Sequence, residues 1–322
     1  MSTADAVRID DFTKRYKGQA AVDRLSLAVP AGSVFGLLGE NGAGKTTTLR
    51  ALLGLIAPDG GRLEVLGLDP AKHGLEVRRR VGYVPEQPAL YDWMTVAEIG
   101  WFASGFHAGG GAGGAGYLVR YGEATRGFDL PPGRKLRELS KGMRSKVSLA
   151  LAVASAPELL ILDEPTSGLD LMVRREFLES MVDLAGAGRT VLLSSHQIAE
   201  VERVASHVAL IHRGRLILAE PLDELRAATA LVTLTLDAAG DPPPFPAAAG
   251  LELELIDAEA APRQARWLVR SADRSALGAI RGLPGVAGLE VEAAGLEEIY
   301  IGYMRGRRAA GGTAPTASAR VA

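Results

Sequence analysis

The chain has 322 residues, 47% of them hydrophobic and 23% charged, which is the balance of a globular protein with a full core. Its length predicts one large domain and a smaller one. With 36 Lys and Arg against 38 Asp and Glu, there is no basic field to attract nucleic acid as a partner. The absence of cysteine excludes disulfides and thiolate metal sites and fits a cytoplasmic protein.

The sequence predicts no segment that enters a membrane. Its first residues, MSTADAVRIDDF, carry early acids and no apolar segment, unlike a signal peptide. No window reaches the ~18 uninterrupted apolar residues of a membrane helix. If the protein works at a membrane, we expect another chain to span it.

The N-terminal part predicts two strands and then a glycine loop. Residues 7–29 alternate apolar and polar side chains around a turn at Lys17-Gly18, which is typical of paired strands. The stretch 34–53, VFGLLGENGAGKTTTLRALL, reads as strand, glycine loop and helix. Residues 39–46 meet the spacing GxxxxGK[ST] in that setting, which strongly indicates a phosphate-binding loop. The alternative is a glycine-rich turn that only joins a strand to a helix.

A phosphate loop of this kind has a specific chemistry. Gly39, Gly42 and Gly44 let successive backbone N–H groups point at a polyphosphate, which also faces the positive end of the following helix. Lys45 would reach the β- and γ-phosphates of a nucleotide, and the Thr46 hydroxyl would hold Mg²⁺. The other residues predicted to contact the nucleotide here are Glu40, Asn41, Ala43 and Thr47.

The middle of the chain predicts short strands at 62–66 and 81–84 and mainly helices over 92–156. A glycine tract, GGGAGGAG at 109–116, interrupts the helices and contains a GxGxxG match. No strand precedes the tract and no good helix-forming sequence follows it, so we interpret it as a flexible loop and not as a dinucleotide site.

The run LLIL at 159–162 is typical of a strand buried on both faces of a parallel sheet. It leads into Asp163, which can reach Mg²⁺, and Glu164, which is placed to polarise a water in line with the γ-phosphate. A solvated strand end is the alternative for two such carboxylates. A helix at 171–185, a strand at 190–193 and a strand at 208–211 follow, and this alternation predicts a parallel α/β sheet.

Beyond residue 225 the pattern changes. Strands are predicted at 230–236, 251–256, 266–270 and 288–292, with a helix at 274–281 and the proline run DPPP at 241–244. We therefore expect a small α+β accessory domain over 226–305. Residues 306–322 are small, polar and basic and are predicted to be disordered.

Several motifs occur in one order: the phosphate loop, LSKGM at 139–143, LLILDE at 159–164, SGLD at 167–170 and His196. This set is similar to the nucleotide-binding subunit of an ATP-binding cassette (ABC) transporter over residues 7–220. The resemblance implies a P-loop NTPase core with a parallel sheet, an N-terminal antiparallel β subdomain and a helical subdomain at about 88–156, within a domain of residues 1–225. LSKGM, like LEEIY at 296–300, resembles export-type subunits that pair with separate membrane proteins.

The resemblance also implies roles for single residues. Tyr16 matches the aromatic residue that stacks on adenine; a packed strand aromatic is the alternative. Gln87, within VPEQP, matches the glutamine that contacts Mg²⁺ and the attacking water. His196 matches the histidine that touches the γ-phosphate. The predicted catalytic set is Glu164, Gln87 and His196. The predicted metal-binding set is Thr46, Gln87 and Asp163.

A second group of residues is implied to act across a dimer of two cassettes. Ser140 and Gly142 would meet the γ-phosphate bound by the opposite subunit, and Asp170 matches the loop that couples the two sites. The sequence departs from the family at three points. LSKGM replaces the usual LSGGQ, Leu171 stands where proline is common, and the glycine tract at 109–116 falls in the helical subdomain that is implied to contact the permease.

A phosphate loop in this setting points to three candidate functions. The first is an ATPase subunit of an exporter, peripheral on the inner face of the cell membrane, which dimerises head to tail around MgATP and drives separate membrane-spanning chains. The second is a soluble ABC-type ATPase that acts as a binding switch, although such proteins commonly carry two cassettes or a long coiled insertion. The third, a GTPase, is excluded because Asn41 is the only asparagine and an NKxD guanine reader is impossible. In the exporter hypothesis, the membrane-spanning chain would choose the cargo.

Overall fold

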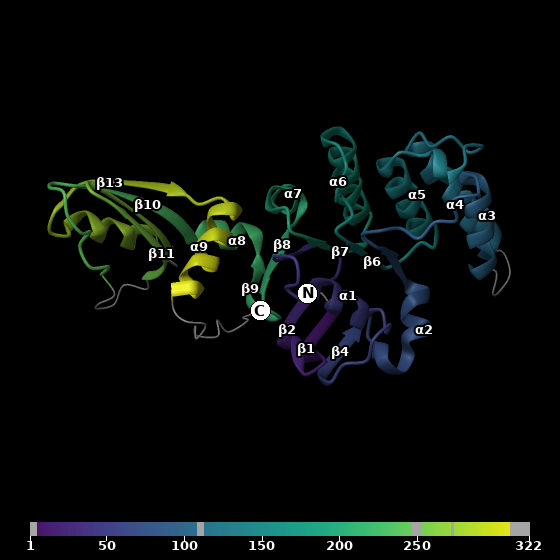
Figure 1. The fold of residues 1–322 in the computed structure, drawn as a ribbon, viewed down its shortest axis with the longest axis horizontal. Helices are drawn as coiled ribbons and strands as arrows, with labels where there is room; N and C mark the ends of the chain where they lie inside the picture. The colour runs from purple at the N-terminus through teal and green to yellow at the C-terminus, as the bar shows by residue number, and fades with distance from the viewer. Residues whose placement is uncertain (1–4, 108–112, 247–252, 272–273, 310–322) are drawn as a thin grey trace. The chain divides into compact units, whose positions relative to one another are not determined.

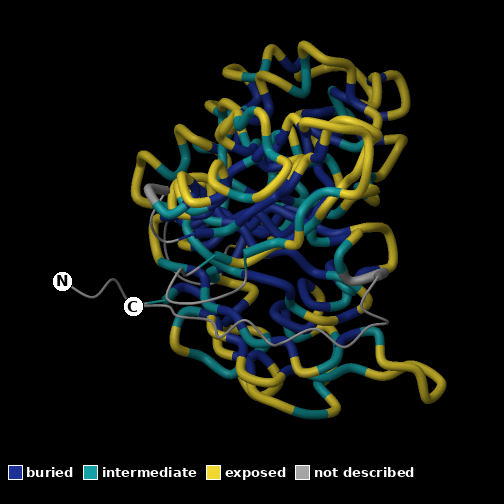
Figure 2. The backbone as a smooth tube through the Cα atoms, turned by 90° about the vertical axis from the view of Figure 1, so that its left-hand side faces the viewer, coloured by how far each residue is buried: buried dark blue, intermediate teal, exposed yellow. Residues whose placement is uncertain are grey.

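The computed structural model describes residues 5–107, 113–246, 253–271 and 274–309. It separates into two compact units, one ending at Ala219 and the other beginning at Glu220. Figure 1 shows the elements of both. Exposed positions lie on the outer turns of the chain and buried ones inside it (Figure 2). None of the helices in the described ranges has the length and apolar character that crossing a bilayer requires.

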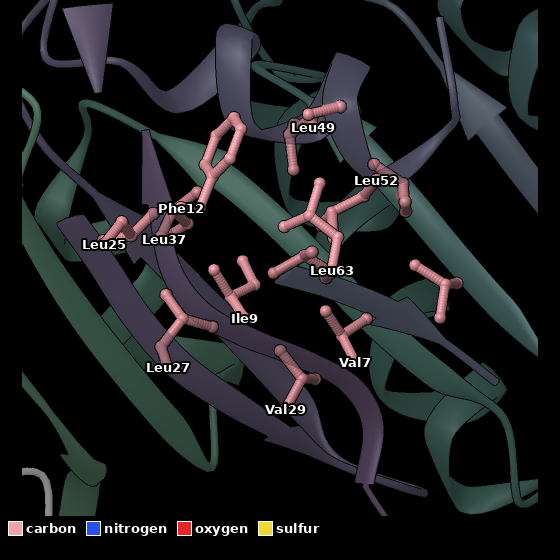
Figure 3. Close-up of a cluster of buried hydrophobic side chains, with 14 of the residues drawn as sticks. Val7, Ile9, Phe12, Leu25, Leu27, Val29, Leu37, Leu49, Leu52 and Leu63 are labelled. Atoms are coloured by element: carbon pink, nitrogen blue, oxygen red, sulfur yellow. The ribbon is translucent and has the colours of Figure 1, made fainter. Parts of the chain in front are cut away.

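A three-stranded antiparallel sheet opens the first unit. Its order is β2 (Gln19–Pro30), β1 (Asp5–Tyr16) and β4 (Gly60–Val65), with the predicted turn between β1 and β2. The alternation of apolar side chains gives the sheet one buried face, and that face packs against α1 (Lys45–Leu52). Figure 3 shows this cluster, which includes Val7, Ile9, Phe12, Leu25, Leu27, Val29, Leu37, Leu49, Leu52 and Leu63.

The central sheet has six strands in the order β5-β6-β7-β3-β8-β9. The bounds are β3 (Val34–Leu38), β5 (Val81–Val84), β6 (Leu159–Asp163), β7 (Thr190–Ser195), β8 (His207–His212) and β9 (Arg215–Pro221). The pairs β5–β6, β6–β7, β7–β3 and β3–β8 are all parallel. Every residue of β3, β6 and β7 is buried, as expected for apolar strands inside a parallel sheet. The register pairs Leu38 with Ser195 and Asp163 with Ser194, so these strands end at one edge.

Helices make up most of the chain between β5 and β6. They are α3 (Val96–Ser104), η1 (Gly105–His107), α4 (Gly113–Gly127), η2 (Leu136–Glu138) and α5 (Lys141–Ala154). α2 (Pro70–Arg80) precedes β5, and α6 (Leu171–Gly186) and α7 (Ile198–Val204) flank β7 in sequence.

The expectation that no helix follows the glycine tract was wrong, because α4 begins within the tract at Gly113. Two buried tyrosines on α4 explain why the helix forms despite its glycines. The Tyr117 hydroxyl donates to Leu151 O at 3.0 Å and the Tyr121 hydroxyl to Val96 O at 2.7 Å. Tertiary packing therefore outweighs the low helix propensity of glycine. Residues 108–112 of the predicted flexible loop lie outside the described residues.

The second unit has an antiparallel sheet in the order β11-β12-β10-β13. Its elements are α8 (Leu222–Ala228), β10 (Thr229–Leu236), β11 (Leu253–Ala261), β12 (Gln264–Ser271), η3 (Arg274–Gly282), β13 (Val286–Ala293) and α9 (Leu296–Ala309). The predicted strands are present within the described residues, while residues 251–252 of the strand predicted at 251–256 lie outside them. The helix predicted over 274–281 is of the 3-10 type. Its buried Leu277 and Ile280 are three residues apart, which matches three residues per turn.

The prediction of disorder from residue 306 was wrong for residues 306–309, which continue α9. Glycines allow this helix to pack closely on the sheet of its own unit. A Cβ on Gly302 would lie 2.3 Å from Leu268 Cδ2, and one on Gly306 would lie 2.5 Å from Ile256 O. Residues 310–322 of the predicted tail lie outside the described residues.

Candidate active site

The loop between β3 and α1 has a backbone that requires glycine. Gly44 has φ 103°, in the left-handed region, and a Cβ there would lie 2.6 Å from Ala21 O of β2. A Cβ on Gly39 would lie 2.5 Å from Ile211 O of β8. The glycines of the predicted motif therefore let this loop pass close to two neighbouring strands. Ala43 is buried, whereas Glu40 and Asn41 are exposed on the rim and Thr47 is half-buried.

Lys45 lies inside this loop with only 5% of its side chain exposed. Its Nζ donates to Gly39 O at 2.6 Å and to Glu40 O at 3.3 Å. The same nitrogen lies 3.0 Å from Oε1 of Glu164. A polyphosphate in the loop would compete for this cation, so the structure places Lys45 where it can exchange a carboxylate for a phosphate.

Asp163, the last residue of β6, lies between two hydroxyl groups. Oδ1 accepts from Thr46 Oγ1 at 3.1 Å and from Ser194 Oγ at 2.7 Å. Hydroxyl and carboxylate oxygens are hard ligands of the kind that Mg²⁺ prefers, so the donor set at Thr46 and Asp163 fits that ion. Sequence reasoning did not single out Ser194. Its place at the end of β7, two residues before His196, was the available signal.

Glu164 and His196 are in direct contact. Oε2 of Glu164 lies 2.7 Å from His196 Nδ1 and accepts from the His196 backbone N–H at 3.2 Å. Glu164 has φ 47°, a left-handed conformation that is uncommon for residues other than glycine and often occurs at functional sites. The buried Glu164 carboxylate is thus held by His196 at one oxygen and by Lys45 at the other, and its role as a general base stays a prediction.

The residues predicted to act across a dimer form a second group, where α5 and α6 begin. Ser140 Oγ caps α5 by accepting from Met143 N, and Asp170 caps α6. A Cβ on Gly142 would lie 2.9 Å from Val173 Cγ1. Within this chain, then, the contacts of Ser140, Gly142 and Asp170 are made at these helix N-termini. A role at the nucleotide of another subunit stays a prediction.

Tyr16 and Gln87 lie on separate segments. Tyr16 ends β1 and is 47% exposed, with Lys14 Nζ 5.7 Å from its ring centre. It pairs with Gln19 of β2, the strand that also touches Gly44 through Ala21, so the β1–β2 hairpin adjoins the phosphate loop. Gln87 is exposed and follows β5, which pairs with β6.

Comparisons with known proteins establish the family of this chain. A family model described as ABC transporter matches residues 22–167. The daunorubicin resistance ATP-binding protein DrrA3 of Streptomyces coeruleorubidus is 39% identical over 227 residues, which cover 70% of this chain and 71% of the relative. The bacitracin transport ATP-binding protein BcrA of Bacillus licheniformis is 37% identical over 224 residues, 68% of this chain and 71% of the relative.

A solved structure of an ATP binding subunit of an ABC transporter has TM-score 0.63 and 31% identity, covering 69% of this chain and 92% of that chain. The chain therefore belongs to the ABC transporter family, as its nucleotide-binding ATPase cassette. The predicted family, the α/β P-loop fold and the ATPase activity are confirmed.

Proposed function

We propose that this chain hydrolyses MgATP as the peripheral subunit of an exporter, on the inner face of the membrane, with separate chains spanning it. The observation that carries the proposal is the contact of Lys45, Glu164 and His196 at the mouth of the phosphate loop. The names of the relatives support export, since they include daunorubicin resistance, bacitracin transport and Nod factor export.

In this mechanism the chain binds the nucleotide through the backbone N–H groups of residues 39–46 and through Lys45. Thr46, Asp163 and Gln87 would hold Mg²⁺, which neutralises charge on the phosphate oxygens. Tyr16 stacks on adenine. In the described ranges, His, Asp and Glu side chains form no group of three that could hold a metal, so phosphate oxygens and waters would complete the shell.

Glu164 then acts on the water that attacks the γ-phosphorus. As the new P–O bond forms and the bond to the β-phosphate oxygen breaks, the Glu164 carboxylate takes the proton of the water and ADP leaves. The imidazole of His196 holds the carboxylate in place and, on its exposed side, faces the γ-phosphate. Its side chain is 41% exposed, whereas that of Glu164 is 8% exposed.

We further propose that two cassettes assemble head to tail, so that Ser140 and Gly142 of one chain meet the γ-phosphate bound by the other. Asp170 would lie between the two sites. One solved cassette of the same fold, with TM-score 0.62 and 24% identity, is a dimer bound to ADP and Pi. The second cassette is a copy of this chain or a related one.

Glu164→Gln tests the proposal. Removal of a positioned general base lowers the rate by roughly 10²- to 10⁴-fold, while the ground-state contacts of Lys45 and Asp163 stay in place. We expect the variant to bind ATP in equilibrium titrations and to have almost no phosphate release. Glu158→Gln is the control, because Glu158 precedes the same strand but pairs with Arg80 on the surface. Near-normal turnover by Glu164→Gln would contradict the proposed role.

A further inference from the structure

A buried ion pair lies next to the site, and the mechanism above does not use it. Glu200 of α7 is 4% exposed, and its Oε1 lies 3.1 Å from Nε of Arg174 of α6. The other oxygen, Oε2, accepts a hydrogen bond from the Thr166 hydroxyl. Among the described residues neither Oε1 of Glu200 nor Nε of Arg174 makes a hydrogen bond, so these two atoms are compensated by the opposite charge beside them.

The guanidinium of Arg174 bridges two loops of the site. Nη1 donates to Oε1 of Gln197 at 2.7 Å, and Gln197 follows His196 in the chain. Nη2 donates to the backbone carbonyl of Leu169 at 3.1 Å, and Leu169 precedes Asp170. One side chain therefore joins the loop that carries the histidine to the loop that begins α6.

The carboxylate of Glu200 is placed at a cost that the fold must compensate. Burial raises the pKa of Glu200, while the Thr166 hydroxyl and Arg174 act in the opposite direction. Glu164 and His196 also act electrostatically on Glu200. A buried pair of this kind is weak evidence for stability in itself, because apolar side chains of similar volume often do as well. A role in orientation is the better account of why charges stand here.

We propose that Glu200, acting through Arg174 and Thr166, is a positioning residue for ATP hydrolysis. The pair holds the His196 loop against the loop before Asp170, and this keeps His196 Nδ1 on the carboxylate of Glu164. The inference rests on the proposed roles of Glu164 and His196. Because the same guanidinium holds the loop predicted to face the second cassette, a displacement of that loop also displaces the histidine.

The test is kinetic and uses the full chain. In Glu200→Gln we expect kcat to fall about tenfold to a hundredfold, as a misplaced catalytic group does, with KM for ATP at the wild-type value. The phosphate loop and Lys45 are untouched, so ATP binding is kept. Against a His196→Ala background, the same substitution should cause no further fall in single-turnover rate, because its effect passes through the histidine.

Two further variants make the result decisive. Thr166→Val keeps the side-chain shape and removes the hydroxyl, and we expect it to lower kcat as Glu200→Gln does. It therefore serves as the test if the Glu200→Gln protein does not fold. Arg175→Met is the matched control: Arg175 neighbours Arg174 on α6 but pairs with Glu179 on the surface at 2.8 Å. We expect wild-type kinetics from it.

Three results would overturn the inference: wild-type kcat in the folded Glu200 and Thr166 variants, a loss of ATP affinity that accounts for the fall, or an equal further fall in the His196→Ala background. These outcomes are distinct from failure of the proposed function. A wild-type chain that binds ATP without hydrolysing it in any assembly would remove the proposed function itself.

Discussion

The hydroxyl of Ser194 links the carboxylate of Asp163 to the backbone of Glu164. It donates to Asp163 Oδ1 and accepts from the backbone N–H of Glu164 at 3.1 Å. Ser194 is fully buried, so water does not easily take the place of its hydroxyl as a hydrogen-bond partner. Loss of the hydroxyl would therefore leave buried polar atoms unsatisfied, which is unfavourable. Ser194 therefore holds the carboxylate of Asp163 and the backbone of Glu164, and we infer that it supports the site without touching the nucleotide.

We expect Ser194→Ala to lower kcat and to raise the Mg²⁺ concentration that gives half-maximal ATPase activity. The reason is that Asp163 keeps only the Thr46 hydroxyl and is less firmly held. The loss of stability should be about 1 kcal/mol, the usual net value of one hydrogen bond, measured by urea unfolding. Ser195→Ala is the matched control, since Ser195 is equally buried but its hydroxyl accepts from Gln197 N. Identical Mg²⁺ dependence in the two variants would contradict this role.

At the scale of elements, the first turn of α5 packs on the first turn of α6. Gly142 is buried there, and a Cβ on it would lie 2.9 Å from Val173 Cγ1. Valine cannot rotate away easily, because its β-branched side chain has one preferred rotamer in a helix. The glycine of the LSKGM sequence therefore has a structural reason within this chain, in addition to the one implied by the family.

We expect Gly142→Ala to reduce ATPase activity and to destabilise the fold by about 1 to 3 kcal/mol, as overpacking does. Adding Val173→Ala should restore the stability, because it removes the methyl groups that the new Cβ meets.

The ATPase activity of the Gly142→Ala, Val173→Ala double variant is then the informative measurement. Its recovery in the double variant indicates that the packing of α5 on α6 was the defect. Activity that stays lost in a stable double variant indicates that Gly142 itself must approach the nucleotide. A Gly142→Ala protein as stable as the wild type would contradict the packing argument.

At the scale of the whole molecule, all predicted site residues lie in the unit that ends at Ala219. The second unit has its own apolar core, with Val232, Leu234, Trp267 and Val269 among its buried residues. A separate core is what allows a domain to fold by itself. The assignment of residues 226–305 as an accessory domain stays a prediction that truncation can test.

We expect a chain truncated after Ala228 to bind ATP with the affinity of the full chain. This truncation keeps β9 and α8 but removes Arg270, which makes a bidentate pair with Glu220 at 2.9 and 2.7 Å. A second form of the truncated chain should therefore carry Glu220→Gln, so that no carboxylate is left without its partner. Calorimetric titration with ATP is the measurement. Loss of binding by a truncated chain that still unfolds cooperatively would show that the second unit supports the site.

The proposed dimer predicts complementation between two inactive variants. Lys45→Ala damages the phosphate loop and Ser140→Arg damages the surface offered to the partner. In a mixed dimer both changes fall on one composite site, and the other site is wild type. Mixing the two proteins should restore part of the activity, with a steeper than first-order dependence on protein concentration.

A separate experiment checks dimer formation: light scattering of the Glu164→Gln protein in the presence of ATP. If neither recovery nor a dimer is seen, two copies of this chain do not form the composite site.

Local chemistry explains what could be predicted from the sequence alone. The phosphate loop requires glycines at fixed spacing, and a buried parallel strand requires an uninterrupted apolar run. Both requirements are met within about ten residues, so β3, α1 and β6 were predicted correctly from the sequence. The same patterns singled out Lys45, Thr46, Asp163 and Glu164 as candidate site residues. The predicted order of the motifs then led to the family that the comparisons confirm.

The tertiary structure decided what depends on contacts between distant residues. Ser194 meets Asp163 across 31 positions of sequence and Glu200 meets Thr166 across 34, and no local pattern records either pair. The expectation that no good helix follows the glycine tract was wrong for the same reason, because α4 is held by the Tyr121 hydroxyl on Val96 O of α3, a contact that its glycine-rich start does not indicate. Sequence spacing determines the backbone that a segment can adopt. The partners that orient a carboxylate, or make a weak helix stable, come from other elements, and only the packed fold brings them together.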